Sequence, residues 1–287
     1  MTFTEAELER LLLPEYEKSL RDAGVIGPDT PDGLFMDWME NAARNGVNPS
    51  EMVRIAQQAD LDENSFDFMS DWEQVQDNDG KTYFFLPRDV SSEDAMRGTL
   101  LTYIFNANTG YADADGHENN DFPATPYSAA EVERIMNRQE ANKWSYGDHG
   151  WFKDKVVPDL MDHRAHPQSY QVTTPNGVMM GVGGPTAWSQ RGGTMYGDLF
   201  WVNWDGDKEF WQYVDDPKEQ FREMIEDGYM HFPSDDFSVA ERGGNDLDRV
   251  LHHEERHARQ WTHNSTWYMA THNDEIEEDA GLSDGGY

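Results

Sequence analysis

The sequence of 287 residues contains no cysteine, few basic side chains and no long apolar run. Without cysteine there is no disulfide, cysteine nucleophile, iron–sulfur cluster or Cys-ligated zinc, so any metal must be bound by His, Asp or Glu. No stretch approaches the roughly 20 apolar residues of a membrane span, and the N-terminus lacks the basic start and apolar run of a secretory signal. We therefore expect a soluble protein with no membrane span and no Sec signal, which leaves cytoplasmic, virion-associated and non-Sec exported locations open.

Charge of one sign dominates the chain. Asp and Glu number 56 against 22 Lys and Arg, which gives a formal net charge of -34. Such a charge repels nucleic-acid phosphates, and no basic patch is visible in the sequence, so we predict no nucleic-acid partner. Only 7 of the basic residues are Lys. Abundant carboxylates with scarce lysine are typical of proteins that work in high salt, which favours halophilic adaptation, and an acidic protein from an ordinary host is the alternative.

Apolar residues are numerous enough to fill a sizeable core, since 37% of the chain is hydrophobic, with 10 Trp, 14 Phe and 12 Tyr. We predict an α+β protein in two parts. Residues 1–165 form a mostly helical region of unassigned role, with a polar, Gly- and Pro-containing loop over 106–128. Residues 166–287 form a domain in which a small antiparallel or mixed sheet packs on a later helix.

Local motifs place the expected elements. Capping boxes begin at Thr4 and Ser128, and Asn48-Pro49 has the form of an N-cap followed by a first-turn proline. Turn residues between apolar runs predict hairpins. The expected helices cover 4–24, 32–44, 48–59, 91–105, 128–147, 216–227 and a stretch from 245 or 246 onward, and the expected hairpins cover 75–85, 170–182 and 199–214.

The last of these helices carries the sequence His253-Glu254-Glu255-Arg256-His257. On an α-helix, residues i and i+4 lie on one face about one turn apart, so two imidazoles at this spacing can bind one tetrahedral zinc ion. The Glu directly after the first His is placed to accept a proton from a metal-activated water. This pattern is the HExxH motif of the zincins.

Composition alone rarely produces such a motif. With 10 His and 24 Glu in 287 residues, chance supplies roughly 0.03 occurrences per chain. Apolar residues near the spacing of one helical face give the segment a side for packing. The competing interpretation is an exposed, charged helix face with no metal, which is common in so acidic a chain. The apolar residues concerned are Leu247, Val250, Leu251 and Ala258.

The extended motif His253 to Gln260 resembles the HExxHxxQ signature of compact bacterial and phage zincin-like metallopeptidase domains of the gluzincin type. In that family a glycine-led strand precedes the motif and an acidic segment follows it. Residues 193–202 are similar to the strand, and Glu277-Glu278-Asp279-Ala280 is similar to the acidic segment. The resemblance covers about residues 190–287. It implies a zincin fold whose sheet edge lies beside the zinc helix, and a glutamate as third ligand.

Residue roles follow from the chemistry and from this resemblance. His253 and His257 are the expected zinc ligands and Glu254 the expected general base. A tetrahedral oxyanion needs a hydrogen-bond donor, for which Tyr268 is the candidate, with His263 or His272 as alternatives. Asp279 or Glu278 is a candidate partner for a ligand imidazole, and His252 is expected to take no part.

Two glutamates compete for the place of third ligand. Glu277 follows His257 after 19 intervening residues, which is similar to the gap in thermolysin-like gluzincins. Glu275 instead forms a Glu-x-x-x-Asp pair with Asp279. On a helix Glu275 and Glu277 point about 200° apart, so only one of them can face the zinc. We favour Glu277, with Glu275 next and His263, His272 or Glu278 remaining open.

The favoured function is a zinc-dependent peptidase or amidase acting on a peptide substrate, which includes cell-wall peptides by analogy of fold. The alternative is a virion or effector assembly protein whose zincin-like domain is inactive or binds a partner. The first 165 residues favour this alternative, because they exceed what a minimal zincin needs and offer a surface for protein partners.

The charge generates a first prediction. Raising the salt concentration should raise the melting temperature, because screening weakens repulsion among the excess of 34 negative charges. Calorimetry between low and molar potassium chloride measures this shift. A melting temperature that does not change would contradict both the repulsion and the adaptation to high salt.

Overall fold

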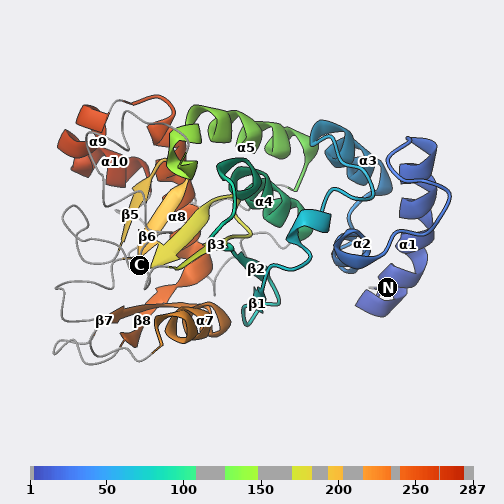
Figure 1. The fold of residues 1–287 in the computed structure, drawn as a ribbon, viewed down its shortest axis with the longest axis horizontal. Helices are drawn as coiled ribbons and strands as arrows, with labels where there is room; N and C mark the ends of the chain where they lie inside the picture. Colours follow the sequence, from blue (N-terminus) through green and yellow to red (C-terminus); the bar gives the residue numbers. More distant parts are fainter. Residues whose placement is uncertain are drawn as a thin grey trace.

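The computed structural model describes residues 3–107, 127–147, 170–182, 193–202, 216–233, 240–264 and 266–280. The fold is α+β: helices of the first half lie at one end, C-terminal helices lie at the other, and a six-stranded mixed sheet lies between them (Figure 1). Most of the polar loop predicted over 106–128, and the strand predicted over 209–214, lie outside the described residues. Within the described ranges, no helix combines the length and the apolar character needed to cross a membrane.

Three helices of the first half begin at the predicted caps Thr4, Asn48 and Ser128, and a fourth begins at Ser91. The Thr4 side chain accepts from the Glu7 backbone amide while Glu7 accepts from the Thr4 backbone amide, which completes a capping box. Asn48, Ser91 and Ser128 each accept a backbone amide of the following turn. The helices are α1 (Glu5–Asp22), α2 (Gly33–Arg44), α3 (Pro49–Gln58), α4 (Ser92–Phe105) and α5 (Ala129–Ala141), with short 3-10 turns at Asp67–Met69 and Lys143–Tyr146.

The large sheet has the strand order β1-β2-β3-β4-β6-β5. All neighbouring strands are antiparallel except β4 and β6, which are parallel. The hairpins predicted over 75–85 and 170–182 are confirmed as β1–β2 and β3–β4. The strands are β1 (Gln74–Gln76), β2 (Thr82–Phe85), β3 (Tyr170–Thr173), β4 (Met179–Val182), β5 (Gly193–Tyr196) and β6 (Leu199–Val202).

The stretch 193–202, which the resemblance presents as a single strand, is instead a tight hairpin. Tyr196 pairs with Leu199, and the chain reverses through Gly197 and Asp198. Gly197 has a φ of 61°, a conformation that glycine adopts without steric cost. A Gly-Asp pair between two apolar runs is a hairpin signal, so the turn was readable from the sequence.

The sheet extends across residue 165, where we expected a division between two parts. β2 pairs with β3 through Phe84 with Thr173 and Phe85 with Val172. Because neighbouring residues of a strand face opposite sides, Phe84 packs into the helical core of α1 to α5 while Phe85 packs into the second core. Both cores therefore share one sheet, and β1 and β2 come from the first half of the chain.

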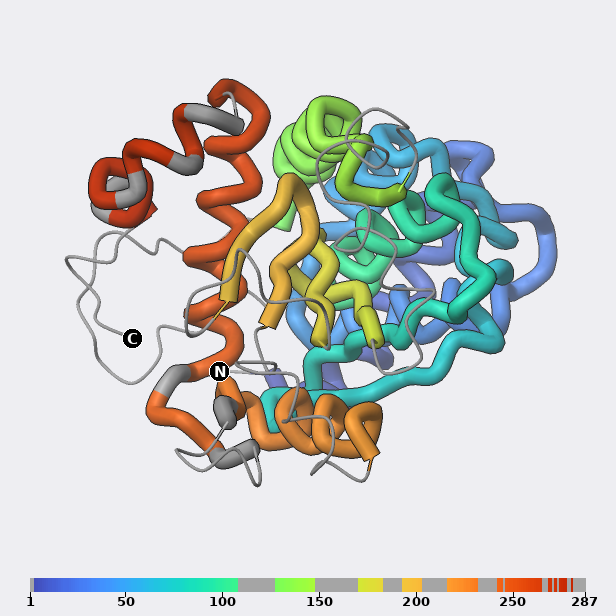
Figure 2. Tube along the Cα trace, turned by 60° about the vertical axis from the view of Figure 1, so that its left-hand side comes forward, coloured from blue at the N-terminus to red at the C-terminus, as the bar shows by residue number. Residues whose placement is uncertain are grey.

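The second core lies between the sheet and the C-terminal helices, and α8 is its central helix. Asp246 caps α8 by accepting from the Arg249 backbone amide at 3.1 Å. The helix packs on β5 and β6, and Trp261 Nε1 donates to the Met195 carbonyl of β5, the last strand of the sheet, at 2.8 Å. Figure 2 shows α8 crossing beside the strands, with the later helices above it. The elements are α7 (Pro217–Asp227), β7 (Tyr229–Pro233), β8 (Ala240–Asp246), α8 (Leu247–Trp261), α9 (Thr266–Thr271) and α10 (Asn273–Asp279).

Candidate metal centre

Helix α8 presents two faces of different chemistry. Leu247, Leu251 and Ala258 are almost completely buried in the second core and fix the rotation of the helix about its axis. His253 and His257, one turn apart, are also buried. The packing of the apolar face therefore fixes the helix so that both imidazoles point to the same side of it.

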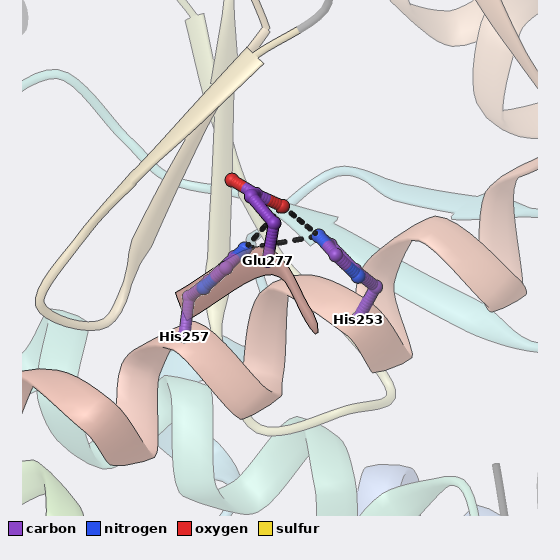
Figure 3. A group of neighbouring side chains, drawn as sticks. All are labelled: His253, His257 and Glu277. Carbon is purple, nitrogen blue, oxygen red and sulfur yellow. Dashed lines mark hydrogen bonds and ion pairs between the residues drawn. The ribbon is translucent and has the colours of Figure 1, made fainter. Parts of the chain in front are cut away.

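The structure brings His253, His257 and Glu277 into one cluster. The Nε2 atoms of the two imidazoles are 2.9 Å apart, and Glu277 Oε2 lies 3.1 Å from the first and 3.3 Å from the second. Figure 3 shows both rings rising from α8 toward the Glu277 carboxylate, which belongs to α10. Three donor atoms from two helices therefore converge on one point.

Hydrogen bonds fix which nitrogen of each ring faces that point. His253 Nδ1–H donates to the Ala280 carbonyl at 2.8 Å, and His257 Nδ1–H donates to Gln260 Oε1 at 2.8 Å. Both acceptors are oxygens, so the proton of each neutral ring resides on Nδ1. Each Nε2 then has its lone pair directed into the cluster, which is the tautomer that a metal requires.

Gln260 has a second contact that joins the two helices. Its Nε2 donates to the Ile276 carbonyl at 3.0 Å, one residue before Glu277. The same side chain therefore orients His257 on α8 and holds α10 in place. Gln260 is the last residue of the HExxHxxQ pattern. Its position in the pattern does not reveal this second contact, because the Ile276 carbonyl is 16 residues away in the sequence. The Ala280 carbonyl is likewise a backbone group that no side-chain motif reveals.

Two imidazole nitrogens and one carboxylate oxygen form a donor set that suits zinc. A tetrahedron with zinc–ligand bonds near 2.0 Å has edges of about 3.3 Å. The three donor–donor separations of 2.9 to 3.3 Å are close to that edge length. The residues present therefore fit a zinc ion with three protein ligands, which leaves one position for water or substrate.

Without a metal, a proton holds the cluster together. Burial lowers the pKa of His257, but the hydrogen bond that its ring donates to Glu277 and the charges of Glu254 and Glu277 outweigh it and raise this pKa to about 9. For Glu277, burial raises the pKa, and the contacts with His253 and His257 outweigh it and lower the value to about 2. The metal-free cluster therefore contains an imidazolium and a carboxylate at neutral pH, and a divalent cation must displace the proton.

Glu254 differs from the three ligands because its carboxylate has an unused oxygen. The side chain is 8% exposed, and its Oε2 atom has no hydrogen-bond partner among the described residues. Burial raises the pKa of Glu254, Glu277 raises it further, and His257 and His253 lower it. An unpartnered buried carboxylate is costly to retain, and such groups concentrate where a protein moves protons.

The other residues considered from the sequence lie outside the cluster. Tyr268, the expected oxyanion donor, directs its hydroxyl at Glu275 Oε2 at 3.1 Å and stacks on His272 with ring centroids 4.1 Å apart. The structure thus brings Tyr268 and Glu275 to each other and not to the ligands. His263 is exposed on the surface, and burial lowers the pKa of His252 to about 4, so that its ring is neutral. The side chains of Glu278 and Asp279 are outside the described residues.

The pKa values generate a prediction for the metal-free protein. The raised pKa of His257 stabilises the fold fully below its unfolded value of 6.5, and this contribution is lost as the pH rises through about 9. Between pH 6 and pH 10, the unfolding free energy in EDTA should fall by about 1–3 kcal/mol more for the wild type than for His257→Gln. Urea unfolding across that range measures both proteins. Equal pH dependence in the two would contradict the assignment of the proton to His257.

Comparison of the chain with protein-family models, with curated proteins and with solved structures gives no significant match. The geometry of the His253–His257–Glu277 cluster and of its surroundings is therefore what a functional assignment must rest on. That assignment concerns a site and not a fold, since one fold supports many activities.

Proposed function

We propose that this protein is a zinc-dependent peptidase or amidase that hydrolyses a peptide bond, with cell-wall peptides among its candidate substrates. Zinc is bound by His253, His257 and Glu277, and Glu254 is the general base. The observation that carries the proposal is the pairing of this donor set with the unpartnered, buried Glu254 carboxylate on the same helix. A structural zinc site is usually closed by four protein ligands and needs no adjacent base.

The chain supplies the remaining parts of a hydrolytic site. Bound zinc would supply Lewis-acid chemistry, lowering the pKa of a water molecule and polarising the scissile carbonyl. The Glu254 carboxylate accepts the proton of the attacking water and delivers it to the leaving nitrogen. The Ala280 carbonyl and Gln260 keep both imidazoles in the ligand tautomer through this cycle.

A substrate backbone has a strand to lie against. β5 is the last strand of the six-stranded sheet and packs against α8, which carries the site. An extended peptide can add to the edge of a sheet through main-chain hydrogen bonds, independently of its side chains. This placement is compatible with a peptide substrate, although Trp261 already occupies the Met195 carbonyl of β5.

The assembly alternative is supported less than it was by the sequence. That alternative rested on the size of the first half, which exceeds what a minimal zincin needs and could bind protein partners. β1 and β2 from that half are strands of the central sheet, and Arg138 of α5 forms an ion pair with Glu255 of α8. Much of the first half therefore has a structural role in the sheet and in the contacts with α8.

Metal binding should depend on Glu277 and not on Glu275. We expect about one zinc per wild-type chain, and we expect Glu277→Ala to bind it at least about tenfold more weakly because one of three ligands is lost. Glu275→Ala is a matched control on the same helix, since Glu275 contacts Tyr268. Metal analysis and chelator competition measure both. The ligand assignment is wrong if Glu275→Ala loses zinc while Glu277→Ala retains it.

Hydrolysis should depend on Glu254. Glu254→Gln should retain zinc and lose about 10²- to 10⁴-fold of the turnover, because the amide has nearly the same shape but accepts no proton. The assay measures cleavage of peptide and cell-wall peptide substrates by zinc-loaded proteins. If the zinc-loaded wild type cleaves none of them and the fourth zinc position is filled by a protein side chain, the assembly alternative is favoured instead.

A further inference from the structure

Helix α8 is attached to the first half of the chain at two points, one before His253 and one that extends from Glu255 past His257. One point is Asp248, in the first turn of the helix, and the other is the stretch from Glu255 to Ala258. His253, Glu254 and His257 lie between or within these attachments. The partners on the other side come from the β1–β2 hairpin and from α5 with the turn that follows it.

The first attachment is a buried ion pair between Lys81 and Asp248. Lys81 is 4% exposed and Asp248 is 9% exposed, so neither charge is solvated by bulk water. Lys81 follows the turn of the hairpin, whose shape is set by Asp77: its Oδ1 accepts the backbone amides of Asp79 at 2.9 Å and Lys81 at 2.8 Å. The lysine therefore extends from a rigid turn.

The hairpin tip fits closely against its surroundings. A Cβ atom placed on Gly228, at the end of α7, would lie 2.4 Å from Asn78 Oδ1, so the tip approaches the backbone there as closely as glycine permits. Burial and the charge of Asp248 raise the pKa of Asp77 to about 6, although Lys81 opposes this rise. Asp77, Asp248 and Lys81 thus form one buried group of charges at the start of α8.

The second attachment is centred on Arg138 of α5, which is 3% exposed. Its guanidinium forms ion pairs with Glu255 of α8 and with Asp198 of the β5–β6 turn, and it donates to the Gly177 carbonyl of the β3–β4 turn. Burial raises the pKa of Glu255, but Arg138, Arg134 and Arg259 outweigh it and lower this pKa to about 2. One arginine therefore joins α8 to two turns of the sheet.

Asn142, just after α5, completes this attachment. Its Nδ2 donates to Asp198 Oδ1 at 2.7 Å and to the Ala258 carbonyl of α8 at 2.8 Å. Tyr146 donates its hydroxyl to the other oxygen of Asp198 at 2.9 Å. These bonds all join residues before 147 to residues after 170, and the bond to the Ala258 carbonyl ends one residue beyond His257.

We propose that Lys81 and Arg138 are positioning residues of the metal centre: they hold α8 before the HExxH segment, at Asp248, and within it, at Glu255, so that its two histidines meet Glu277. This inference rests on the proposed function. A placement of the helix that breaks one of these contacts removes a partner from a buried charge, which is costly, so the ion pairs favour the placement that keeps them. Ligand geometry tolerates displacements of only about 0.5 Å, so placement of the helix sets metal affinity.

The chain provides a control in a more exposed pair of ion pairs between its two halves. Lys218 and Arg222 of α7 bind Glu73, just before β1, at 2.5 Å each, so they also join the two halves of the chain. These pairs contact α7 and not α8. Removing them by Glu73→Gln with Lys218→Met deletes a connection between the halves while leaving both ends of the metal helix attached.

The experiment compares full-length variants for zinc affinity and for hydrogen exchange of the α8 amides from 250 to 258. Lys81→Met with Asp248→Asn removes both charges of the ion pair, and Asp77 keeps its hydrogen bonds from the backbone amides of residues 79 and 81. Arg138→Lys keeps the second charge but cannot reach its three partners together, and Arg138→Met removes it. We expect zinc affinity to fall by roughly 2- to 30-fold in the double variant and in Arg138→Met, with a smaller loss in Arg138→Lys and none in the control.

The outcomes separate this inference from the function on which it rests. If the double variant and Arg138→Lys are folded and bind zinc like the wild type, the inference is wrong, even when hydrolysis depends on Glu254. If the control loses as much affinity as the variants, the effect is general loss of stability and the inference is also wrong. If the wild type binds no zinc, the proposed function fails, and faster exchange of the α8 amides in the metal-free variants still tests the attachments themselves.

Discussion

Three atoms with lone pairs directed at one point repel one another unless a positive charge lies among them, and the C-terminal part of this protein is arranged around that constraint. His253 Nε2, His257 Nε2 and Glu277 Oε2 lie 2.9 to 3.3 Å apart. The Ala280 carbonyl and Gln260 fix the opposite nitrogen of each ring, so neither ring can turn its lone pair away without losing a buried hydrogen bond. A cation is therefore the natural occupant, whether a proton in the metal-free protein or a divalent metal ion.

The helices up to α8 and two hairpins could be predicted because their signals are local, whereas the short helices α9 and α10 were not predicted. Thr4, Asn48, Ser91 and Ser128 each cap a helix by bonding to an amide two or three residues away, which the sequence displays directly. The hairpin over 193–202 was missed because the Gly-Asp turn lies within a stretch similar to one strand of a known family. The shared sheet was also not predictable, since β2 pairs with a strand more than eighty residues away and no local pattern encodes that pairing.

The candidate site likewise contains some residues that the sequence indicates and others that only the fold identifies. His253 and His257 are readable from their i, i+4 spacing, and Glu277 was favoured by its distance along the chain, although only the fold shows that α10 returns to α8. Tyr268 had the right chemistry and sequence proximity, but its hydroxyl is directed at Glu275. Arg138 gave no signal at all, because a single arginine on a polar helix normally faces water, and its burial depends on three partners from three separate segments.

The long separations of the two attachments bear on the order in which the protein folds. Lys81 and Asp248 are 167 residues apart, and Arg138 and Glu255 are 117 apart. Contacts among α1, α2 and α3 close much shorter loops, and loop-closure entropy delays distant contacts relative to near ones. We therefore expect the helical core to assemble early and the metal centre last. A metal ion that binds only the finished site adds its stabilisation after the folding transition state, so it slows unfolding while leaving the rate of folding nearly unchanged.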